Sequence, residues 1–253
     1  MLFSCATVPV TSRSQINFIP DSTVISMSLQ EYDKFLKNHE LSKNQKQTKM
    51  VKRVGRKIRY AVERYFNKQN MADQTKNYVW EFNLVKGKEK NAWCMPGGKV
   101  VVYEGIMPLA QNDEGLAVIM GHEIAHAIAK HGNERMSQGL LIQAGSAALN
   151  VATQKQSSFK KRIFMNVFGV GTQLGFMLPY SRIHEKEADY LGLIFMTLAG
   201  YDPHEATAFW KRMNKDGGPR PPEFLSTHPT PETRIKEIEK AIPQILNQYL
   251  KLP

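Results

Sequence analysis

The feature that most constrains this chain is the run NDEGLAVIMGHEIAHAIAKHG, which extends from Asn112 to Gly132. It opens with residues that favour a helix N-terminus and closes on a glycine that suits a left-handed helix cap. Between these ends, apolar residues recur at helical spacing, namely Leu116, Ile119, Met120, Ala127 and Ile128. The pattern predicts one buried amphipathic helix, in which Gly121 allows a second backbone to approach closely.

Inside this segment, residues 122–126 read HEIAH. Two histidines four residues apart on a helix differ by about 40° in direction, so His122 and His126 can bind one metal ion. Glu123 lies beside that ion and can take a proton from a water molecule. The pattern predicts a zinc hydrolase, whereas the alternative is a core helix whose histidines make ordinary hydrogen bonds. A catalytic zinc site uses three protein ligands, so a third must come from elsewhere.

A second helix is predicted from Ser181, a good N-cap residue, to Gly200. Its apolar face consists of Leu191, Ile194, Phe195 and Leu198. Glu185 and Asp189 are four residues apart on another face. This spacing suits a carboxylate ligand followed by a carboxylate that holds the far nitrogen of a metal-bound histidine. The alternative is that both are solvated surface charges.

Three nearby residues also need assignment. Glu187 points about 200° round the helix from Glu185, so only one of the two can be a ligand. His184 is a candidate ligand but lies off the face of Glu185. His131 lies past the body of the first helix, where it can cap the last carbonyls.

The remaining segments predict a largely helical domain. Residues 28–70 have a helical pattern divided near 38–43, and strands are predicted at 78–85, 92–95 and 99–103. We expect these strands to form a small antiparallel sheet beside the HEIAH helix. A strand at the rim of such a site can pair with an extended substrate, or it can be a plain structural edge. Residues 133–180 are predicted to be an inserted helical hairpin, which either gates access or only packs.

Composition limits the classes of partner. The net charge is +11, which favours contact with anionic surfaces. The basic residues are concentrated at 43–59 on a predicted helix, and we interpret them as a solvated face rather than a nucleic-acid site, because no nucleic-acid-binding motif accompanies them. Two cysteines exclude a disulfide framework and a thiolate zinc cluster. Cys94, in a predicted strand, is expected to be a buried small hydrophobe.

HEIAH, taken together with EKEAD at residues 185–189, resembles the M48 family of gluzincin metallopeptidases. Further matching motifs are NA at 91–92, PGG at 96–98, YSR at 180–182, STHP at 226–229 and RI at 234–235. The resemblance implies an α+β, mainly helical gluzincin domain with a small antiparallel sheet beside the active-site helix. We expect a single domain over residues 28–253 after an arm or tether at 1–27. The resemblance also implies that His122, His126 and Glu185 bind one zinc ion.

The expected reaction is internal peptide-bond hydrolysis, in which Glu123 takes a proton from the attacking water and delivers it to the leaving amine. His228 precedes the last predicted helix. It is expected to stabilise the oxyanion or to visit the open position of the metal in a resting state, and the alternative is a turn-stabilising hydrogen bond. Arg234 can support transition-state charge, but a structural anchor is the preferred interpretation.

Cys5 follows Leu2-Phe3-Ser4, which resembles the end of a bacterial lipoprotein signal, although the charged and apolar regions of a signal peptide are absent. On this basis we expect a periplasmic lipoprotein, anchored through Cys5 to the envelope membrane, that cleaves unfolded or misassembled envelope proteins. The rival is a zinc-containing chaperone or assembly factor. Residues 163–180 are long enough for a membrane span but carry polar residues and Pro179, so they read as a buried or interfacial segment.

Overall fold

The computed structural model describes residues 5–147, 181–216, 224–225, 228 and 232–250. Its elements, in chain order, are β1 (Cys5–Thr7), β2 (Ser14–Ile16), α1 (Asp21–Asn38), α2 (Gln45–Lys68), η1 (Ala72–Gln74), β3 (Glu81–Val85), β4 (Ala92–Met95), β5 (Lys99–Tyr103), η2 (Glu104–Ile106), α3 (Met107–Ala110), α4 (Asp113–Ile128), α5 (His131–Ala147), α7 (Arg182–Leu198), α8 (Glu205–Asp216) and α10 (Glu232–Tyr249). The predicted fold class, mainly helical α+β with a small sheet, is confirmed.

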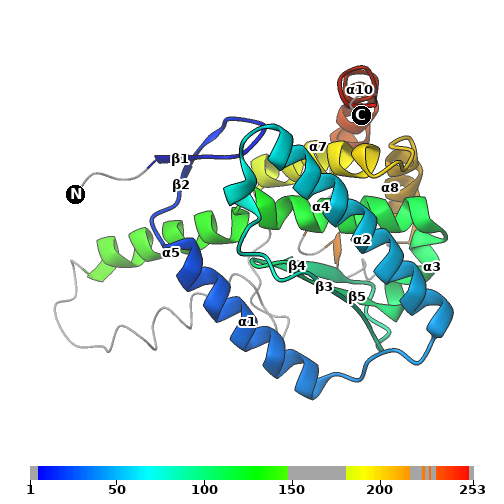
Figure 1. Ribbon diagram of the computed structural model, residues 1–253, viewed down its shortest axis with the longest axis horizontal. Coiled ribbons are helices and arrows are strands. Elements are labelled where there is room, and N and C mark those ends of the chain that lie inside the picture. The colour runs from blue at the N-terminus through cyan, green and yellow to red at the C-terminus, as the bar shows by residue number, and fades with distance from the viewer. Residues whose placement is uncertain (1–4, 148–180, 217–223, 226–227, 229–231, 251–253) are drawn as a thin grey trace.

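Helix α4 lies at the centre of the fold (Figure 1). It packs against α7 and α2 and against strand β4. Its N-terminus is capped by Asn112, whose side chain accepts a hydrogen bond from the backbone N–H of Gly115 at 2.8 Å. Every residue from Gly115 to Ile128 is buried, so His122, Glu123 and His126 lie inside the protein.

Helices α4 and α7 touch through their backbones. A Cβ atom added to Gly192 would lie 2.9 Å from the backbone nitrogen of His122, and one added to Gly121 would lie 3.0 Å from the carbonyl oxygen of Gly192. Neither position has room for a side chain, so these glycines fix the distance between the two helices. The prediction that Gly121 allows a second backbone to approach is confirmed.

The sheet beside α4 is mixed, in the order β3-β5-β4. Strands β4 and β5 form the expected antiparallel hairpin, whose turn places Gly97 and Gly98 at φ of 94° and 86°. Strand β3 pairs with β5 in parallel, so the prediction that all three strands are antiparallel is wrong for this pair. The reason is that the hairpin brings β5 between β3 and β4, although β4 follows β3 in the chain. Helix α1 packs on the sheet through Tyr32 and Phe35.

The N-terminal segment is more ordered than the sequence indicates. Strands β1 and β2 form an antiparallel hairpin beside α5, and α1 begins at Asp21 rather than at Ser28. Residue Pro20 precedes α1 without a side-chain cap, which explains why the start of the helix carries no capping signal. The division into an arm at 1–27 and one domain at 28–253 stays a prediction.

Helix α4 ends earlier than predicted. The chain leaves it through Lys130, at a φ of 58°, and α5 begins at once with His131, so Gly132 lies inside α5 rather than capping α4. Residues 148–180 of the predicted hairpin, including the candidate membrane segment at 163–180, lie outside the described residues. Among the residues that are described, no helix is long and apolar enough to cross a membrane.

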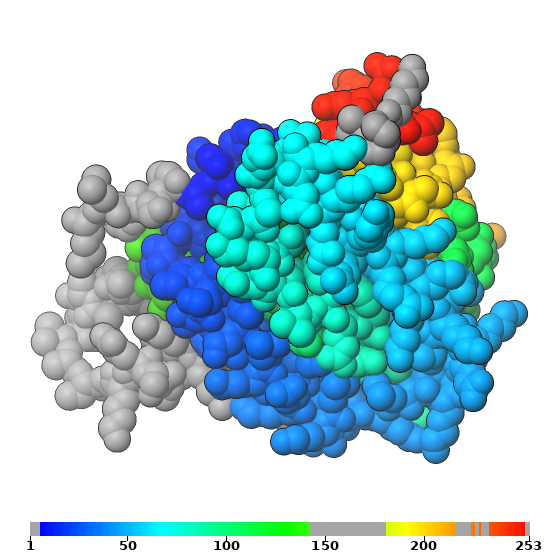
Figure 2. Space-filling model, in the orientation of Figure 1, coloured from blue at the N-terminus to red at the C-terminus, as the bar shows by residue number. Residues whose placement is uncertain are grey.

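Helix α2 covers α4 and lies on the surface of the face seen in Figure 2. Its inner face is apolar, as predicted, with Val51, Val54, Ile58 and Val62 buried. Cys94 is also buried, in β4, as predicted.

Candidate metal centre

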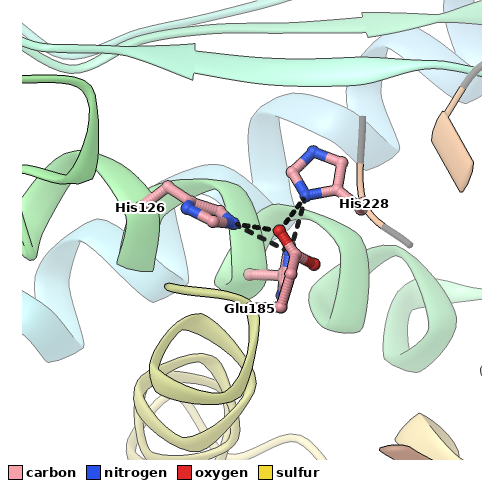
Figure 3. Close-up of side chains that lie close together, drawn as sticks. His126, Glu185 and His228 are labelled. Atoms are coloured by element: carbon pink, nitrogen blue, oxygen red, sulfur yellow. Dashed lines mark hydrogen bonds and ion pairs between the residues drawn. The ribbon is translucent and has the colours of Figure 1, made fainter. Parts of the chain in front are cut away.

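Four buried side chains converge at the crossing of α4 and α7. His122 and His126 come from α4, Glu185 from the first turn of α7, and His228 from the segment before α10. Figure 3 shows His126, Glu185 and His228 turned toward one another. One ligand atom from each of the four lies within 4.8 Å of the others. The structure therefore brings together the three residues implied as ligands and His228.

The spacing of the donor atoms fits a small metal ion. Nε2 of His122 lies 3.1 Å from Nε2 of His126 and 3.2 Å from Nδ1 of His228. Carboxylate oxygens of Glu185 lie 3.5, 3.4 and 2.9 Å from the nitrogens of His122, His126 and His228. Tetrahedral zinc with Zn–N distances of about 2.0–2.1 Å places its ligand atoms about 3.3–3.4 Å apart. The donor set and its spacing therefore fit zinc.

The electrostatics of the cluster favour a cation. Burial alone would lower the pKa of His122, but the carboxylates of Asp189 and Glu185 more than offset this effect, so the net shift is upward. Burial would raise the pKa of Glu185, yet the nearby histidines hold that pKa well below its usual range. An ionised carboxylate among imidazoles is a donor set that a divalent metal ion can satisfy.

The far nitrogen of His122 faces Asp189. Nδ1 of His122 lies 3.0 Å from Oδ1 of Asp189, an acceptor, so the Nδ1–H donates and the Nε2 lone pair points to the centre. Arg234 donates to both oxygens of Asp189 at 2.6 and 2.7 Å, and its Nη1 forms an ion pair with Glu185 at 3.0 Å. Its guanidinium lies 3.6 Å from the ring centroid of Trp210. Arg234 is buried and anchors both carboxylates, in line with the interpretation preferred from the sequence.

The far nitrogen of His126 faces His131, a residue predicted to cap the last carbonyls of α4. Nδ1 of His126 lies 2.8 Å from Nδ1 of His131, and Nε2 of His131 lies 2.9 Å from Glu187. Burial lowers the pKa of His131 to about 4, so its ring is neutral and carries one hydrogen. His131 begins α5 and does not cap α4. Glu187 lies away from the cluster, as the helical angle predicts, and His184 contacts Glu134 at 3.0 Å.

Glu123 lies next to the cluster without being part of it. One of its carboxylate oxygens is 3.3 Å from Nε2 of His228, and its side chain is buried. Burial raises the pKa of Glu123 to about 7. His228 therefore has one nitrogen among the donor atoms and the other near Glu123, and its ring stacks on Phe224 at 4.5 Å.

Comparison with known proteins identifies the family. The profile of peptidase family M48 matches residues 52–242. Mitochondrial metalloendopeptidase OMA1 of Schizosaccharomyces pombe is 35% identical over 171 residues, covering 65% of this chain and 47% of that protein. The protein of the same name from Saccharomyces cerevisiae is 34% identical over 178 residues, covering 67% of this chain and 49% of its own length. The Arabidopsis thaliana relative of that name is 33% identical over 162 residues, covering 64% and 31%. The chain thus spans about half or less of the length of these relatives.

These relatives overturn one prediction. They are eukaryotic proteins whose names place them in mitochondria, so the prediction of a bacterial periplasmic lipoprotein is wrong. That prediction depended on one cysteine after three residues, and such a pattern is too short to specify a leader peptide without its charged and apolar regions.

The family profile covers the helix that carries His122 and His126, the helix that carries Glu185, and the segment that carries His228. The buried donor cluster lies inside this matched range and has the composition that a metallopeptidase needs. This chain therefore belongs to peptidase family M48, whose members are metal-dependent peptidases.

Proposed function

We propose that this chain is a zinc-dependent endopeptidase whose single zinc ion is held by His122, His126 and Glu185. The observation that carries the proposal is the buried cluster of nitrogen and oxygen donors at near-tetrahedral spacing. Imidazole and carboxylate ligands suit zinc, and the helix with two histidines on one turn is the arrangement that zinc hydrolases use.

A bound zinc ion would polarise a peptide carbonyl and lower the pKa of a water molecule from 15.7 towards about 7. In this proposal Glu123 accepts a proton from the attacking water and passes it to the leaving amine nitrogen. A general base works best when its pKa lies near the operating pH, and burial brings the pKa of Glu123 to about 7. The carboxylate is adjacent to His122 in the chain, which keeps the base beside the reacting atoms.

The position of His228 favours the resting-state role over the oxyanion role. Its Nδ1 lies 2.9 Å from Glu185 and 3.2 Å from His122, inside the donor set. A substrate carbonyl needs a free position at that centre. We infer that His228 would occupy this position when zinc is bound without substrate and would leave it to a substrate carbonyl.

Strand β4 supports a polypeptide substrate in extended form. Of the strands that the structure describes, it pairs only with β5, and it packs against α4. An edge strand next to the catalytic helix can bind a peptide by main-chain pairing. The proposed substrates are therefore unfolded segments of polypeptide chains.

The test is casein digestion and metal analysis of wild type and Glu123→Gln, with and without a chelator. Loss of the general base should lower the rate about 10²–10⁴-fold, while zinc content stays at one per chain because Glu123 is not a ligand. Glu114→Gln, in the first turn of the same helix, is the matched control and should digest casein at the wild-type rate. Wild-type zinc binding without any chelator-sensitive digestion would contradict the proposal and favour a chaperone role.

A further inference from the structure

The N-terminal hairpin is connected to the metal centre by a continuous line of contacts that are part-buried at the hairpin and buried at the centre. We propose that Arg13, Glu187 and His131 position His126 and thereby set the affinity of the centre for its metal. The inference rests on the proposed function, in which His126 is a ligand. It assigns a role in metal binding to the segment that the sequence indicates to be an irregular arm.

The contact nearest the centre fixes which nitrogen of each ring carries hydrogen. Glu187 can only accept, so the hydrogen of His131 is on Nε2, 2.9 Å from that carboxylate. Nδ1 of His131 is then an acceptor, and it receives the Nδ1–H of His126 at 2.8 Å. This arrangement leaves the lone pair on Nε2 of His126, the atom that faces Glu185 and His122. The hydrogen bond also holds the ring plane of His126.

The carboxylate of Glu187 is in turn held by the hairpin. Nε of Arg13 donates to it at 2.8 Å, and the hydroxyl of Thr11 donates to its other oxygen. The two terminal nitrogens of Arg13 donate to Glu134 on α5 at 3.0 and 2.7 Å. One guanidinium therefore joins α5 to α7. His131 is fully buried and Glu187 nearly so, which removes water as an alternative partner for these groups.

The two histidines of α4 are supported in a parallel way from opposite ends of the chain. His122 contacts the carboxylate of Asp189 on α7, and the buried Arg234 of α10 binds that carboxylate. His126 contacts His131, which contacts the carboxylate of Glu187 on α7, and Arg13 of the N-terminal hairpin binds that carboxylate. Because partners of this kind hold metal-bound imidazoles in position, their loss weakens metal binding.

The experiment measures the dissociation constant for zinc by competition with a chromophoric chelator. The variants are His131→Phe, which keeps a ring without nitrogens, Glu187→Gln and Arg13→Ala. His131→Phe should bind zinc about 10–100-fold more weakly than wild type. Glu187→Gln should show a smaller loss and Arg13→Ala the smallest. Arg53→Ala is the matched control, because Arg53 also makes a two-pronged ion pair, with Asp113 at the start of α4, but has no link to His126.

A second readout separates positioning from general destabilisation. In cobalt-substituted protein, the visible absorption bands should shift in His131→Phe and Glu187→Gln and stay unchanged in Arg53→Ala. The inference is overturned if folded variants, checked by circular dichroism, bind zinc as tightly as wild type. Arg13→Ala provides this comparison even if the two buried substitutions prevent folding. If wild type itself binds no zinc, the proposed function fails as well, and the two failures are therefore distinguishable.

Discussion

Helix α2 carries its charged side chains on the outside, whereas α4 and α7 also hold ionisable side chains inside the protein. The exposed residues of α2 include Lys46, Lys49, Lys52, Arg53, Arg56, Lys57, Arg59 and Lys68. The only acidic residue on this helix is Glu63, which pairs with Arg59 at 3.0 Å. On α4 and α7, by contrast, His122, Glu123 and Glu185 are each no more than 4% exposed.

The difference shows that buried charged groups, unlike solvated ones, need specific partners and therefore indicate a functional site. A solvated charge needs no partner, so the sequence of α2 can vary its basic residues without consequence for the core. A buried charge is unfavourable unless it is paired and hydrogen-bonded. At the crossing of α4 and α7, the carboxylates of Glu185 and Asp189 form ion pairs with Arg234 and lie against neighbouring imidazoles. Such a concentration of buried ionisable groups is typical of a functional site.

The largest difference is expected when one arginine is removed from the buried cluster and one from the surface of α2. Arg234→Met leaves the carboxylates of Asp189 and Glu185 buried without their main cation, and it should lower the free energy of unfolding by about 3–5 kcal/mol. Arg53→Met removes an exposed ion pair to Asp113, and the expected loss is below about 1 kcal/mol. Urea unfolding of both variants in metal-free protein measures the two values. Equal losses would show that burial does not distinguish the two regions.

A smaller effect comes from the pH dependence of a buried histidine. Burial lowers the pKa of His131 to about 4 from an ordinary value near 6.5. Below pH 6.5 the unfolded chain takes up a proton that the folded chain does not, so stability falls as the pH drops from about 6.5 to about 4. The total is about 3 kcal/mol, at 1.36 kcal/mol for each unit of pKa. It should be visible as the difference between wild type and His131→Phe in urea unfolding at several pH values. Parallel curves for the two proteins would contradict the assignment.

The smallest effect tests how α4 and α7 hold their distance. Gly192→Ala places a methyl group 2.9 Å from the backbone nitrogen of His122, so the helices must move apart. Overpacking of this kind costs about 1–3 kcal/mol. It should also weaken zinc binding, because Glu185 moves with α7 while His122 and His126 stay on α4. A variant with wild-type thermal stability and zinc affinity would show that the helix contact is not tight.

Much of the centre could be predicted because its members lie on two strongly patterned helices. The caps at Asn112 and Ser181 and the four-residue spacings put the side chains on defined faces. The link from Arg13 through Glu187 to His131 could not be predicted. Its members come from a hairpin, the middle of α7 and the start of α5, and no periodicity relates these segments.

The sheet shows the same limit. The turn at Gly97 and Gly98 predicts the β4–β5 hairpin from local residues alone. The parallel pairing of β3 with β5 joins segments whose order depends on tertiary packing against α4 and α1, and local pattern carries no signal for it. The position of His228 is a similar case, because the loop before α10 has no periodicity to direct its ring.

The most direct test of the central claim is anomalous X-ray scattering at the zinc absorption edge, measured on crystals of the wild-type protein. We expect one strong peak per chain within about 2.0–2.2 Å of Nε2 of His122, Nε2 of His126 and a carboxylate oxygen of Glu185. A fully folded protein that shows no zinc peak at the crossing of α4 and α7, or a peak bound by other residues, would contradict the account.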